Sequence, residues 1–433
     1  MAEERFDAVI VGAGPAGSIA AYTMATQGLK VALIERGEFP GAKNIFGGVL
    51  YRKPLDEIIP EFWKEAPLER AVIEQNMWLL GKDSVAKMGY RNEQYKEPNC
   101  WTGLRVKFDA WLAGKAVKAG AVPVYETVVT ELLREEGKVV GVRTDRDDGD
   151  LYANIVVLAD GVNSLLAKSL LAHREWQPDE VSLAVKEVIA LPRQTIEDRF
   201  NLEKGEGVTI ELIGETHGMA GLGFLYTNNE TLSLGVGVMV NDLKKKHIKP
   251  YEVLDGIKQH PMIRRLIQGG EAKEYSGHLI PEGGFNSMPK VAGDGWMIVG
   301  DAGQMVNAVH REGTNLAMTS GKMAGDTAVL AHQRGDFTLH TLSEYTRAVR
   351  ESIIHKDLKK YKGVHGLLSD DKADMMFGEL PQSINNALYD FFLSDGVPKK
   401  EKQKAVFKQV RQATGGNMEL MRLAMKGWRA MNG

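Results

Sequence analysis

The chain has 433 residues, 43% of them hydrophobic, so it can bury a large core and is expected to divide into at least two domains. Its formal net charge of −3 argues against a nucleic-acid-binding protein, and its apolar runs are shorter than the roughly 18 residues of a membrane-spanning helix. A single cysteine, Cys100, excludes disulfides within the chain and an iron–sulfur cluster held by this chain alone. Because no signal-peptide pattern opens the sequence, we expect a cytoplasmic protein.

The first 35 residues have the pattern of a strand, a glycine-rich turn, a helix and a second strand. Phe6–Val11 and Val31–Ile34 are short apolar runs, and the residues between them are helical in pattern. The turn, GAGPAG, places Gly12, Gly14 and Gly17 in the G-x-G-x-x-G spacing. In that spacing the first glycine makes the tight turn, the second lets the backbone approach a pyrophosphate, and the third lets helix and strand pack closely.

Glu35 ends the second strand, where its carboxylate would accept a hydrogen bond from a ribose hydroxyl. A G-x-G-x-x-G turn alone is weak evidence, because an ordinary strand–helix turn can contain it. Here the turn follows a strand, opens a helix and has an acid at the expected distance. The N-terminal unit therefore predicts a dinucleotide site.

The middle of the chain alternates between strand and helix patterns. A helical stretch follows Arg105, and the strands after it have a hairpin at Glu136-Gly137. The run NIVVLADGVNS is a buried strand that ends at Asp160-Gly161 and leads into a helix. From about residue 181 to 290 the sequence alternates as in β-strands, which predicts a β-rich domain inserted into the first domain.

The stretch WMIVGDAG is a buried strand that returns to the first domain and places Asp301 at its carboxyl end. A helix, GTNLAMTSGKMAGDTAVLA, lies behind it. Ligands of open α/β sheets bind outside the carboxyl ends of the strands. Asp301 could accept a hydrogen bond from a ribityl hydroxyl, and the helix N-terminus could stabilise negative charge on a flavin. The alternative is that Asp301 is a helix N-cap.

Three stretches, DAVIVGAGPAG, VVLADGVNS and MIVGDAGQ, occur in the order and rough spacing of FAD-dependent oxidoreductases similar to aromatic hydroxylases and geranylgeranyl reductases. The resemblance implies FAD, and an α/β fold with a discontinuous Rossmann-type FAD-binding domain, an inserted β-sheet substrate domain and a helical C-terminal region. The expected FAD-binding domain spans 1–78, 102–180 and 291–345, the substrate domain spans 79–101 and 181–290, and the helical, basic region spans 346–433.

The motifs and this resemblance together imply the FAD contacts. Arg105 resembles an arginine that lies near the FAD in the superfamily, and its alternative is an exposed arginine at a helix start. The full set of expected FAD-binding residues is Gly12, Ala13, Gly14, Pro15, Ala16, Gly17, Glu35, Arg36, Gly47, Gly48, Arg105, Asp160, Gly300, Asp301, Gly313 and Asn315.

Within the superfamily, three further stretches resemble the electron transfer flavoprotein–quinone oxidoreductase family and its short form, FixC. They are GLGFLYTNNETLSLGVGV, HPMIRRLIQGGEAKEYSGHLIPEGGFNSMPK, of which EGGFNSMPK is the most specific part, and NAVHREGTNLAMTSG. The resemblance implies electron transfer from a two-subunit electron transfer flavoprotein, through FAD, to a membrane quinone, with no catalytic acid or base. It places Gly221, Phe224 and Tyr226 at the quinone, although Leu222 replaces a second family glycine and Phe224 could simply be a sheet residue.

Two departures from the longer members of that family qualify the resemblance. Those members carry a [4Fe-4S] domain that one cysteine cannot supply, so the cluster is expected on a ferredoxin-like partner. The segment that enters lipid in membrane-bound members is polar here, GKDSVAKMGYRNEQYKEPNCW. The basic, amphipathic C-terminal stretch NMELMRLAMKGWRAM could instead associate with the inner face of the cell membrane or an acidic partner, or simply pack on its own protein.

Two other functions share the FAD motifs. One is a flavin-dependent prenyl reductase or hydroxylase, and the other is a non-catalytic FAD-containing docking subunit. His310 and Arg311 follow Asp301 and could tune a flavin or a proton path, but we expect a structural or partner-facing role for them.

Overall fold

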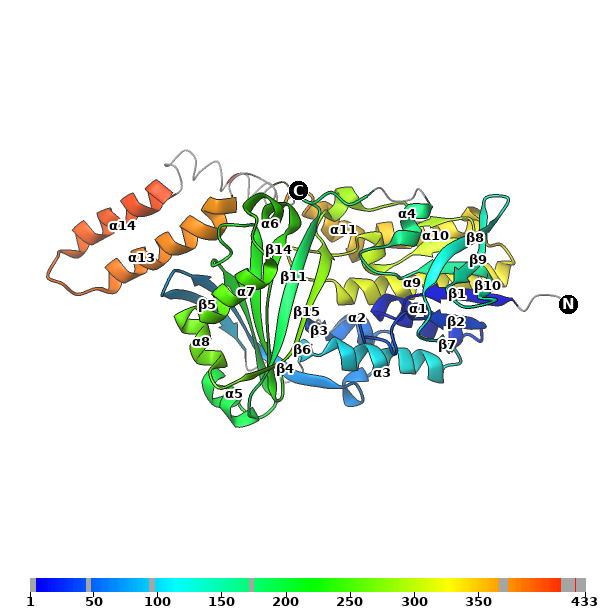
Figure 1. Cartoon of the computed structure of the whole chain (residues 1–433), viewed down its shortest axis with the longest axis horizontal. Helices are drawn as coiled ribbons and strands as arrows, with labels where there is room; N and C mark the ends of the chain where they lie inside the picture. The colour runs from blue at the N-terminus through cyan, green and yellow to red at the C-terminus, as the bar shows by residue number, and fades with distance from the viewer. Residues whose placement is uncertain are drawn as a thin grey trace. The chain divides into compact units, whose positions relative to one another are not determined.

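The computed structural model describes residues 5–43, 48–92, 98–170, 175–364, 366, 373–413 and 425. The chain forms two compact units, each assembled from three segments (Figure 1). Unit 1 consists of Met1–Leu68, Gly103–Gln177 and Ile280–Lys359. Unit 2 consists of Glu69–Thr102, Pro178–Leu279 and Lys360–Gly433.

These units divide the chain at somewhat different places from the domains expected from the sequence. Residues 69–78 belong to unit 2, and residues 280–290 and 346–359 belong to unit 1. The described residues from 360 onward group with unit 2. The expected α/β class is confirmed, because a mixed set of helices and sheets builds the fold.

A parallel sheet forms the centre of unit 1. Its strands run in the order β17-β10-β1-β2-β7, and each neighbouring pair is parallel. All are rich in apolar residues, and β1, β2 and β17 are largely buried, as expected of parallel strands covered on both faces, whereas β7 at the end of the sheet is exposed at Val122 and Pro123. Their bounds are β1 Phe6–Val11, β2 Val31–Ile34, β7 Val122–Val124, β10 Asp150–Leu158 and β17 Trp296–Ile298.

Two different layers cover this sheet. Helices α1 (Pro15–Ala25), α9 (Thr314–Arg334) and α10 (Leu339–Glu351) contribute apolar side chains to the core on one face. The hairpin of β8 (Val129–Glu135) and β9 (Lys138–Thr144) and the short helix α4 contribute to the core on the other face. The hairpin turn is confirmed at Glu136-Gly137, where both residues have positive φ, 49° and 86°, as a tight two-residue turn requires.

The remaining elements of unit 1 are short, apart from α3, which packs against α1. Their bounds are β3 Gly48–Tyr51, α2 Arg52–Asp56, η1 Phe62–Lys64, α3 Arg105–Lys118, α4 Leu165–Ser169, η2 Gly284–Ser287, β16 Ala292–Gly293, η3 Gly300–Gly303 and α11 Ile353–Lys360.

A second, largely antiparallel sheet is the centre of unit 2. Its strands run in the order β15-β11-β14-β13-β12-β4-β6, and β5 pairs with β4. The pairs from β11 to β12 are antiparallel, whereas β12 and β4 are parallel. The bounds are β4 Leu68–Leu80, β5 Val85–Arg91, β6 Cys100–Gly103, β11 Val181–Ala190, β12 Glu206–Ile213, β13 Gly221–Thr227, β14 Thr231–Met239 and β15 Glu271–Pro281.

Helices cover one face of the unit 2 sheet, as Figure 1 shows for α7. Residues of α5 (Arg193–Phe200), α7 (Pro250–Gln259) and α8 (Pro261–Ile267) join alternate strand residues in one apolar core, and α6 is Val240–Lys246. Because side chains alternate between the faces of a strand, the strand residues outside this core point to the opposite face. Phe224 and Tyr226 lie on that opposite face, since Leu225 between them belongs to the core.

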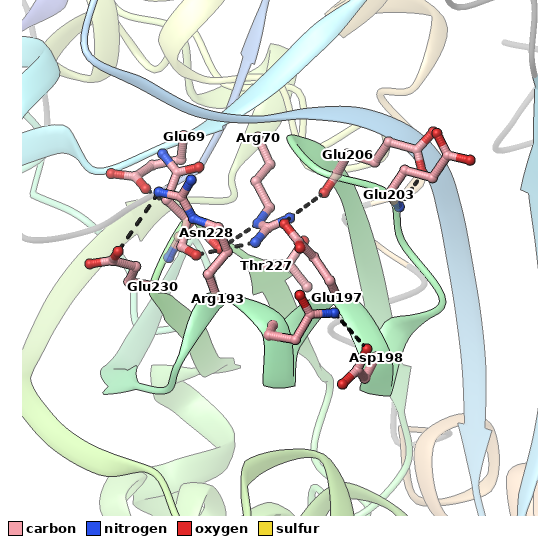
Figure 2. Close-up of polar contacts among 12 residues, drawn as sticks. Glu69, Arg70, Arg193, Glu197, Asp198, Glu203, Glu206, Thr227, Asn228 and Glu230 are labelled. Atoms are coloured by element: carbon pink, nitrogen blue, oxygen red, sulfur yellow. Dashed lines mark hydrogen bonds and ion pairs between the residues drawn. The ribbon is translucent and has the colours of Figure 1, made fainter.

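A buried arginine joins several elements of unit 2. The Arg70 guanidinium donates hydrogen bonds to the carbonyl oxygens of Asn228 at 2.6 Å, Asn229 at 3.1 Å and Glu206 at 2.9 Å. It also forms a 3.0 Å ion pair with Glu197 of α5 (Figure 2). These bonds link β4 to α5, to β12 and to the β13–β14 turn.

The last described helices form a hairpin that belongs to unit 2. A π-helical turn (η4, Met375–Glu379) leads into α13 (Leu380–Phe392), and α14 (Lys399–Ala413) runs beside it (Figure 1). The basic stretch NMELMRLAMKGWRAM lies outside the described residues except for Met425. Within the described part of the chain, no helix combines the length and apolarity needed to cross a bilayer.

Candidate functional site

The residues singled out at the ends of the apolar strand runs gather at one edge of the unit 1 sheet. Two of its parallel strands end directly before Gly12 and Glu35, and two others are separated from Asp160 and from Gly300-Asp301 by one residue each, Ala159 and Val299. Carboxyl ends of parallel strands share one edge, so the fold brings these residues together although the chain separates them widely.

Two of the three motif glycines in the GAGPAG turn are required by close packing. Gly12 has φ of 103°, and a Cβ there would lie 2.4 Å from the carbonyl oxygen of Ala159. A Cβ on Gly17 would lie 1.9 Å from the carbonyl oxygen of Gly12, so neither residue can carry a side chain. A Cβ on Gly14, in contrast, would meet no atom within 4 Å. The turn is thus tightly packed at both ends and open in its middle.

Helix α1 begins at this open position. Gly14 is its N-cap without a side-chain hydrogen bond, and Pro15 occupies the first helical turn. The N–H groups of Ala16 and Gly17 are in the first turn, where a helix offers them no acceptor of its own. Together with the helix dipole they make an anion-binding end. Ala13 and Ala16 are buried beside it.

Glu35 lies against the same turn. One carboxylate oxygen accepts the N–H of Ala13 at 3.1 Å, and the other accepts the N–H of Gly37 at 2.8 Å. These two bonds hold the carboxylate at the end of β2. The neighbouring Arg36 is exposed. The ribose contact expected for Glu35 stays a prediction.

Helix α9 brings a second N-terminus to this edge. A Cβ on Gly321 would lie 2.2 Å from the carbonyl oxygen of Ala16, and one on Gly325 would lie 2.6 Å from the Cβ of Thr23. These glycines therefore let α9 pack closely on α1, with both helices running in the same direction. The Ser320 hydroxyl accepts the N–H of Gly300 at 3.0 Å, which ties the β17 end to α9.

Asp301 is not the N-cap of helix α9. It lies in the first turn of the short 3₁₀ helix η3, whereas α9 begins at Thr314 with Gly313 as its N-cap. The reading of Asp301 as the cap of the long helix was therefore wrong. Gly300, with φ of 63°, and Gln304, with φ of 60°, prevent η3 from continuing into a regular helix.

A charged group faces Asp301 in unit 1. Arg105 donates to both carboxylate oxygens of Asp109, from Nε at 2.6 Å and Nη2 at 2.8 Å. Burial alone would lower the pKa of Arg105, but Asp109 and Asp301 together raise it. Burial raises the pKa of Asp109 against the opposing effect of Arg105. The Arg105 side chain is mostly buried, so it is not the exposed helix-start arginine of the alternative reading.

Asp160 is a buried carboxyl with a raised pKa at this edge. Burial raises its pKa to about 6, although Ser164 donates a 3.2 Å hydrogen bond to Oδ1. Ser164 itself has a left-handed backbone, with φ of 35°, at the start of α4. The folded unit thus disfavours a charge on Asp160.

The segment between η3 and α9 contains polar groups that the sequence did not reveal. Gln304 and Asn307 are each only 1% exposed. Among the described residues, neither the Gln304 amide nor Nδ2 of Asn307 has a hydrogen-bond partner. A buried polar group without a partner costs about 1–3 kcal/mol, so these amides indicate a site for a polar ligand or water. No spacing or motif signals them, because their burial depends on the tertiary fold.

The other expected FAD contacts are only partly placed. Asn315 is buried in the first turn of α9 beside Gly313. Gly48 begins β3, and a Cβ there would meet nothing within 4 Å. Gly47 lies outside the described residues.

The expected quinone residues lie on β13 of unit 2. The Phe224 and Tyr226 rings stack with centroids 5.0 Å apart and planes 24° from parallel. A Cβ on Gly235 would lie 2.3 Å from Cζ of Phe224, so the ring covers this glycine of β14. A Cβ on Gly221 would lie 2.4 Å from the carbonyl oxygen of Gly237, so sheet packing alone requires glycine there.

Known proteins are similar to this chain over almost its whole length. Residues 7–180 match a family described as FAD dependent oxidoreductase, and residues 364–432 match the ETF-QO/FixC family C-terminal domain. Protein FixC of Bradyrhizobium diazoefficiens is 50% identical over 413 residues, covering 94% of this chain and 95% of that protein. The chain belongs to the ETF-QO/FixC family. It is an FAD-dependent oxidoreductase, as the sequence predicted.

Other relatives agree in length and fold. Protein FixC of Azotobacter vinelandii is 47% identical over 435 residues, 99% of each chain. The probable electron transfer flavoprotein-quinone oxidoreductase YdiS of Escherichia coli is 37% identical over all of both chains. A geranylgeranyl bacteriochlorophyll reductase-like protein of Thermoplasma acidophilum has a TM-score of 0.75 at 20% identity, covering 98% of this chain and 99% of its own, which shows a shared fold.

The edge of the unit 1 sheet fits FAD on its own geometry. The open position at Gly14 and the N-terminus of α1 suit a pyrophosphate. The N-terminus of α9 and the unpartnered amides of Gln304 and Asn307 offer polar groups to the flavin part of the cofactor.

Proposed function

We propose that this FixC-family flavoenzyme transfers electrons from a two-subunit electron transfer flavoprotein, with a ferredoxin-like partner, to a membrane quinone. The observation that carries the proposal is the full-length similarity to the quinone oxidoreductase named above, together with the match to the ETF-QO/FixC C-terminal domain. Bound FAD supplies the capacity to accept and pass on electrons. The chain itself binds, orients and shields the cofactor.

The residues of unit 1 have distinct tasks in this proposal. The backbone around Gly14 and the N-terminus of α1 bind the pyrophosphate, and Glu35 accepts a hydrogen bond from the ribose. Asp301 accepts a hydrogen bond from a ribityl hydroxyl. Arg105 acts on the site through its charge, because its guanidinium is already bound in a bidentate pair with Asp109. The N-terminus of α9 stabilises negative charge that arrives with electrons.

The aromatic pair on unit 2 supports a quinone contact. Phe224 and Tyr226 offer stacked, rigid rings on the face that the α5, α7 and α8 core does not occupy. Flat aromatic rings bind another planar ring by offset stacking or edge contacts. The proposal assigns these two side chains to the quinone ring, whereas Gly221, three residues before Phe224 on β13, shares the face of Leu225 and would contact the quinone only through its backbone.

The cysteine count is consistent with a cluster on a ferredoxin-like partner. A [4Fe-4S] cluster needs four thiolates, and the chain contains only Cys100, which is buried. Electrons that travel through such a cluster must therefore reach the FAD from another chain.

The α13–α14 hairpin supports peripheral contact with the inner face of the cell membrane. Phe392 and Phe407 are 74% and 76% exposed, and Tyr389 is also largely exposed. Lys399 and Lys402 donate to backbone carbonyls at the end of α13, which holds the turn between the helices in place. Exposed aromatic residues next to lysines are typical of surfaces that lie in the headgroup region of anionic membranes.

Vesicle binding tests this surface separately from electron transfer. We expect the holoprotein to co-sediment with phosphatidylglycerol vesicles and the double variant Phe392→Ser/Phe407→Ser to stay in solution. Variant Tyr251→Ser, which removes an exposed aromatic residue of α7, is the control. Equal sedimentation of all three proteins would assign membrane contact to another surface.

Anaerobic visible spectroscopy tests the electron-transfer proposal. Flavin absorbance near roughly 450 nm is followed in the purified holoprotein with the flavoprotein, the ferredoxin-like chain and a quinone analogue. We expect bleaching that requires the partner proteins and recovery when quinone is added. Bleaching by NAD(P)H alone would instead indicate one of the other flavoenzymes. Recovery of the absorbance after addition of a prenyl lipid would indicate a reductase, and recovery after addition of oxygen and an aromatic substrate would indicate a hydroxylase. No bleaching by any partner would indicate a docking subunit.

A further inference from the structure

A closed loop fixes the residue that precedes helix α9. The backbone N–H of Asn307 donates to the carbonyl oxygen of Glu312 at 2.9 Å, and the N–H of Glu312 donates back to Asn307 at 3.1 Å. The side-chain oxygen of Asn307 accepts the N–H of His310 at 3.3 Å, which braces the loop from inside. Glu312 is thereby held directly before Gly313, the N-cap of α9.

The Glu312 carboxyl is half-buried among groups from three elements. Its side chain hydrogen-bonds Asn315 in the first turn of α9. It also interacts electrostatically with His310 of its own loop and with Asp357 of α11. Burial raises the pKa of Glu312, and Asp357 raises it further, whereas His310 and Asn315 act in the opposite direction. Burial and Asp357 together outweigh the other two groups.

The Glu312 carboxylate and a reduced flavin would both place negative charge at the N-terminus of α9. The N-terminus of a helix carries roughly half a positive charge, and that effect is confined to its first turn. Electrons that enter an FAD bound at α9 bring negative charge to the same place. Two negative charges at one helix end repel each other, so the arrival of the second raises the proton affinity of the first.

We propose that Glu312 couples electron entry to proton uptake, so that its carboxylate binds a proton from solvent when the cofactor is reduced and releases it on reoxidation. On electron entry, one Glu312 carboxylate plus one proton becomes one carboxylic acid. On reoxidation the carboxylic acid returns this proton to solvent and becomes a carboxylate again, so the cycle balances. This role rests on the placement of FAD in the proposed function, and it makes Glu312 a charge-compensating residue.

The pH dependence of the flavin midpoint potential tests the proposal without any partner or quinone. The holoprotein is titrated with dithionite and mediator dyes between about pH 5.5 and 9, in wild type and in Glu312→Gln. We expect the variant to have a more positive potential at alkaline pH and a smaller change of potential per pH unit. The matched control Glu351→Gln removes an exposed acid at the end of α10 and should follow the wild-type curve.

Asp357→Asn provides an independent test if Glu312→Gln does not retain FAD. Loss of the neighbouring charge should move the bend in the curve of potential against pH to lower pH, because Glu312 then loses its proton more easily. A Glu312→Gln curve parallel to the wild type, or an unmoved bend in Asp357→Asn, would overturn the role of Glu312. Neither result depends on which protein donates electrons or whether a quinone accepts them, so the proposed function is tested separately.

Discussion

Two buried polar clusters in this protein differ in how fully the chain satisfies them. In unit 2, three nitrogens of Arg70 each find acceptors, and most of these acceptors are backbone carbonyls. In unit 1, Gln304 and Asn307 are equally buried, but their amides have no partner among the described residues. The first cluster belongs to the architecture, and the second indicates a binding site.

Burial of a polar group is therefore not by itself a sign of function. A satisfied group such as Arg70 contributes to stability and to the specific arrangement of strands and helices. A group left unsatisfied in the segment between η3 and α9 costs free energy that a bound cofactor can recover. Substitutions in the two regions should therefore separate stability from cofactor binding.

The glycine-rich turn should give the largest effects. Gly12→Ala meets both a left-handed backbone and a 2.4 Å contact, so we expect loss of FAD and marked loss of apoprotein stability. Gly14→Ala meets neither obstacle, because the N-cap has φ of −70° and its Cβ would face open space. We expect unchanged apoprotein stability but FAD binding weakened more than about tenfold, roughly 1.4 kcal/mol.

These variants are compared by the flavin-to-protein absorbance ratio, by FAD titration and by thermal unfolding of the apoprotein. Gly28→Ala is the control, because its φ of 81° costs about 1–2 kcal/mol at a position without close contacts. It should lower stability and keep FAD. Full FAD affinity in Gly14→Ala would contradict the placement of the pyrophosphate.

Arg70→Met should have the next largest effect, and it should act on stability alone. The change leaves the Glu197 carboxylate and several carbonyls buried without their donor, which costs about 3–5 kcal/mol. The measurement is the unfolding midpoint, with the flavin content of the folded fraction measured in parallel. Arg193→Met, which removes a partly exposed pair with Glu230, should change little. Loss of flavin from folded Arg70→Met would show that the two clusters are not independent.

Asp160→Asn should have a smaller effect, and it should raise the stability of the apoprotein instead of lowering it. The pKa of Asp160 is raised from 3.8 to about 6, so its ionised form destabilises the folded apoprotein. The penalty is absent below about pH 4, grows between pH 4 and 6, and is complete above that range. The amide removes it, so we expect stabilisation on the order of 1–2 kcal/mol at pH 8 and little difference at pH 4.5. Unfolding midpoints of the wild type and the variant at both pH values measure the stabilisation. An equal increase in stability at both pH values would show that ionisation of Asp160 is not its cause.

Local patterns explain which parts of the fold were predictable from the sequence. The β1–α1–β2 unit and the Glu136-Gly137 turn depend on glycine spacing and turn chemistry, which lie within a few residues of each other. The Arg105–Asp109 pair also has a local i,i+4 spacing, although the sequence analysis did not single out Asp109.

The missed features depend on contacts between distant segments. Arg70 looks like an ordinary polar strand residue until β4 is packed against the β13–β14 turn and α5. The unpartnered amides of Gln304 and Asn307 depend on how the segment after η3 folds over the core. The two units also divide the chain at other residues than the expected domains do. The segment that begins at Lys360 groups with unit 2, whose strands lie much earlier in the sequence.

The most direct test of the account is a stopped-flow comparison of the two half-reactions in Phe224→Ala. In the proposed function electrons enter at the FAD of unit 1 and the quinone binds on the unit 2 face, so reduction by the electron transfer flavoprotein should stay near the wild-type rate. Reoxidation by a quinone analogue should slow by about tenfold or more, while Tyr251→Ala behaves as wild type. Unchanged reoxidation, or an equal loss in both half-reactions, would contradict the assignment of the quinone to this face.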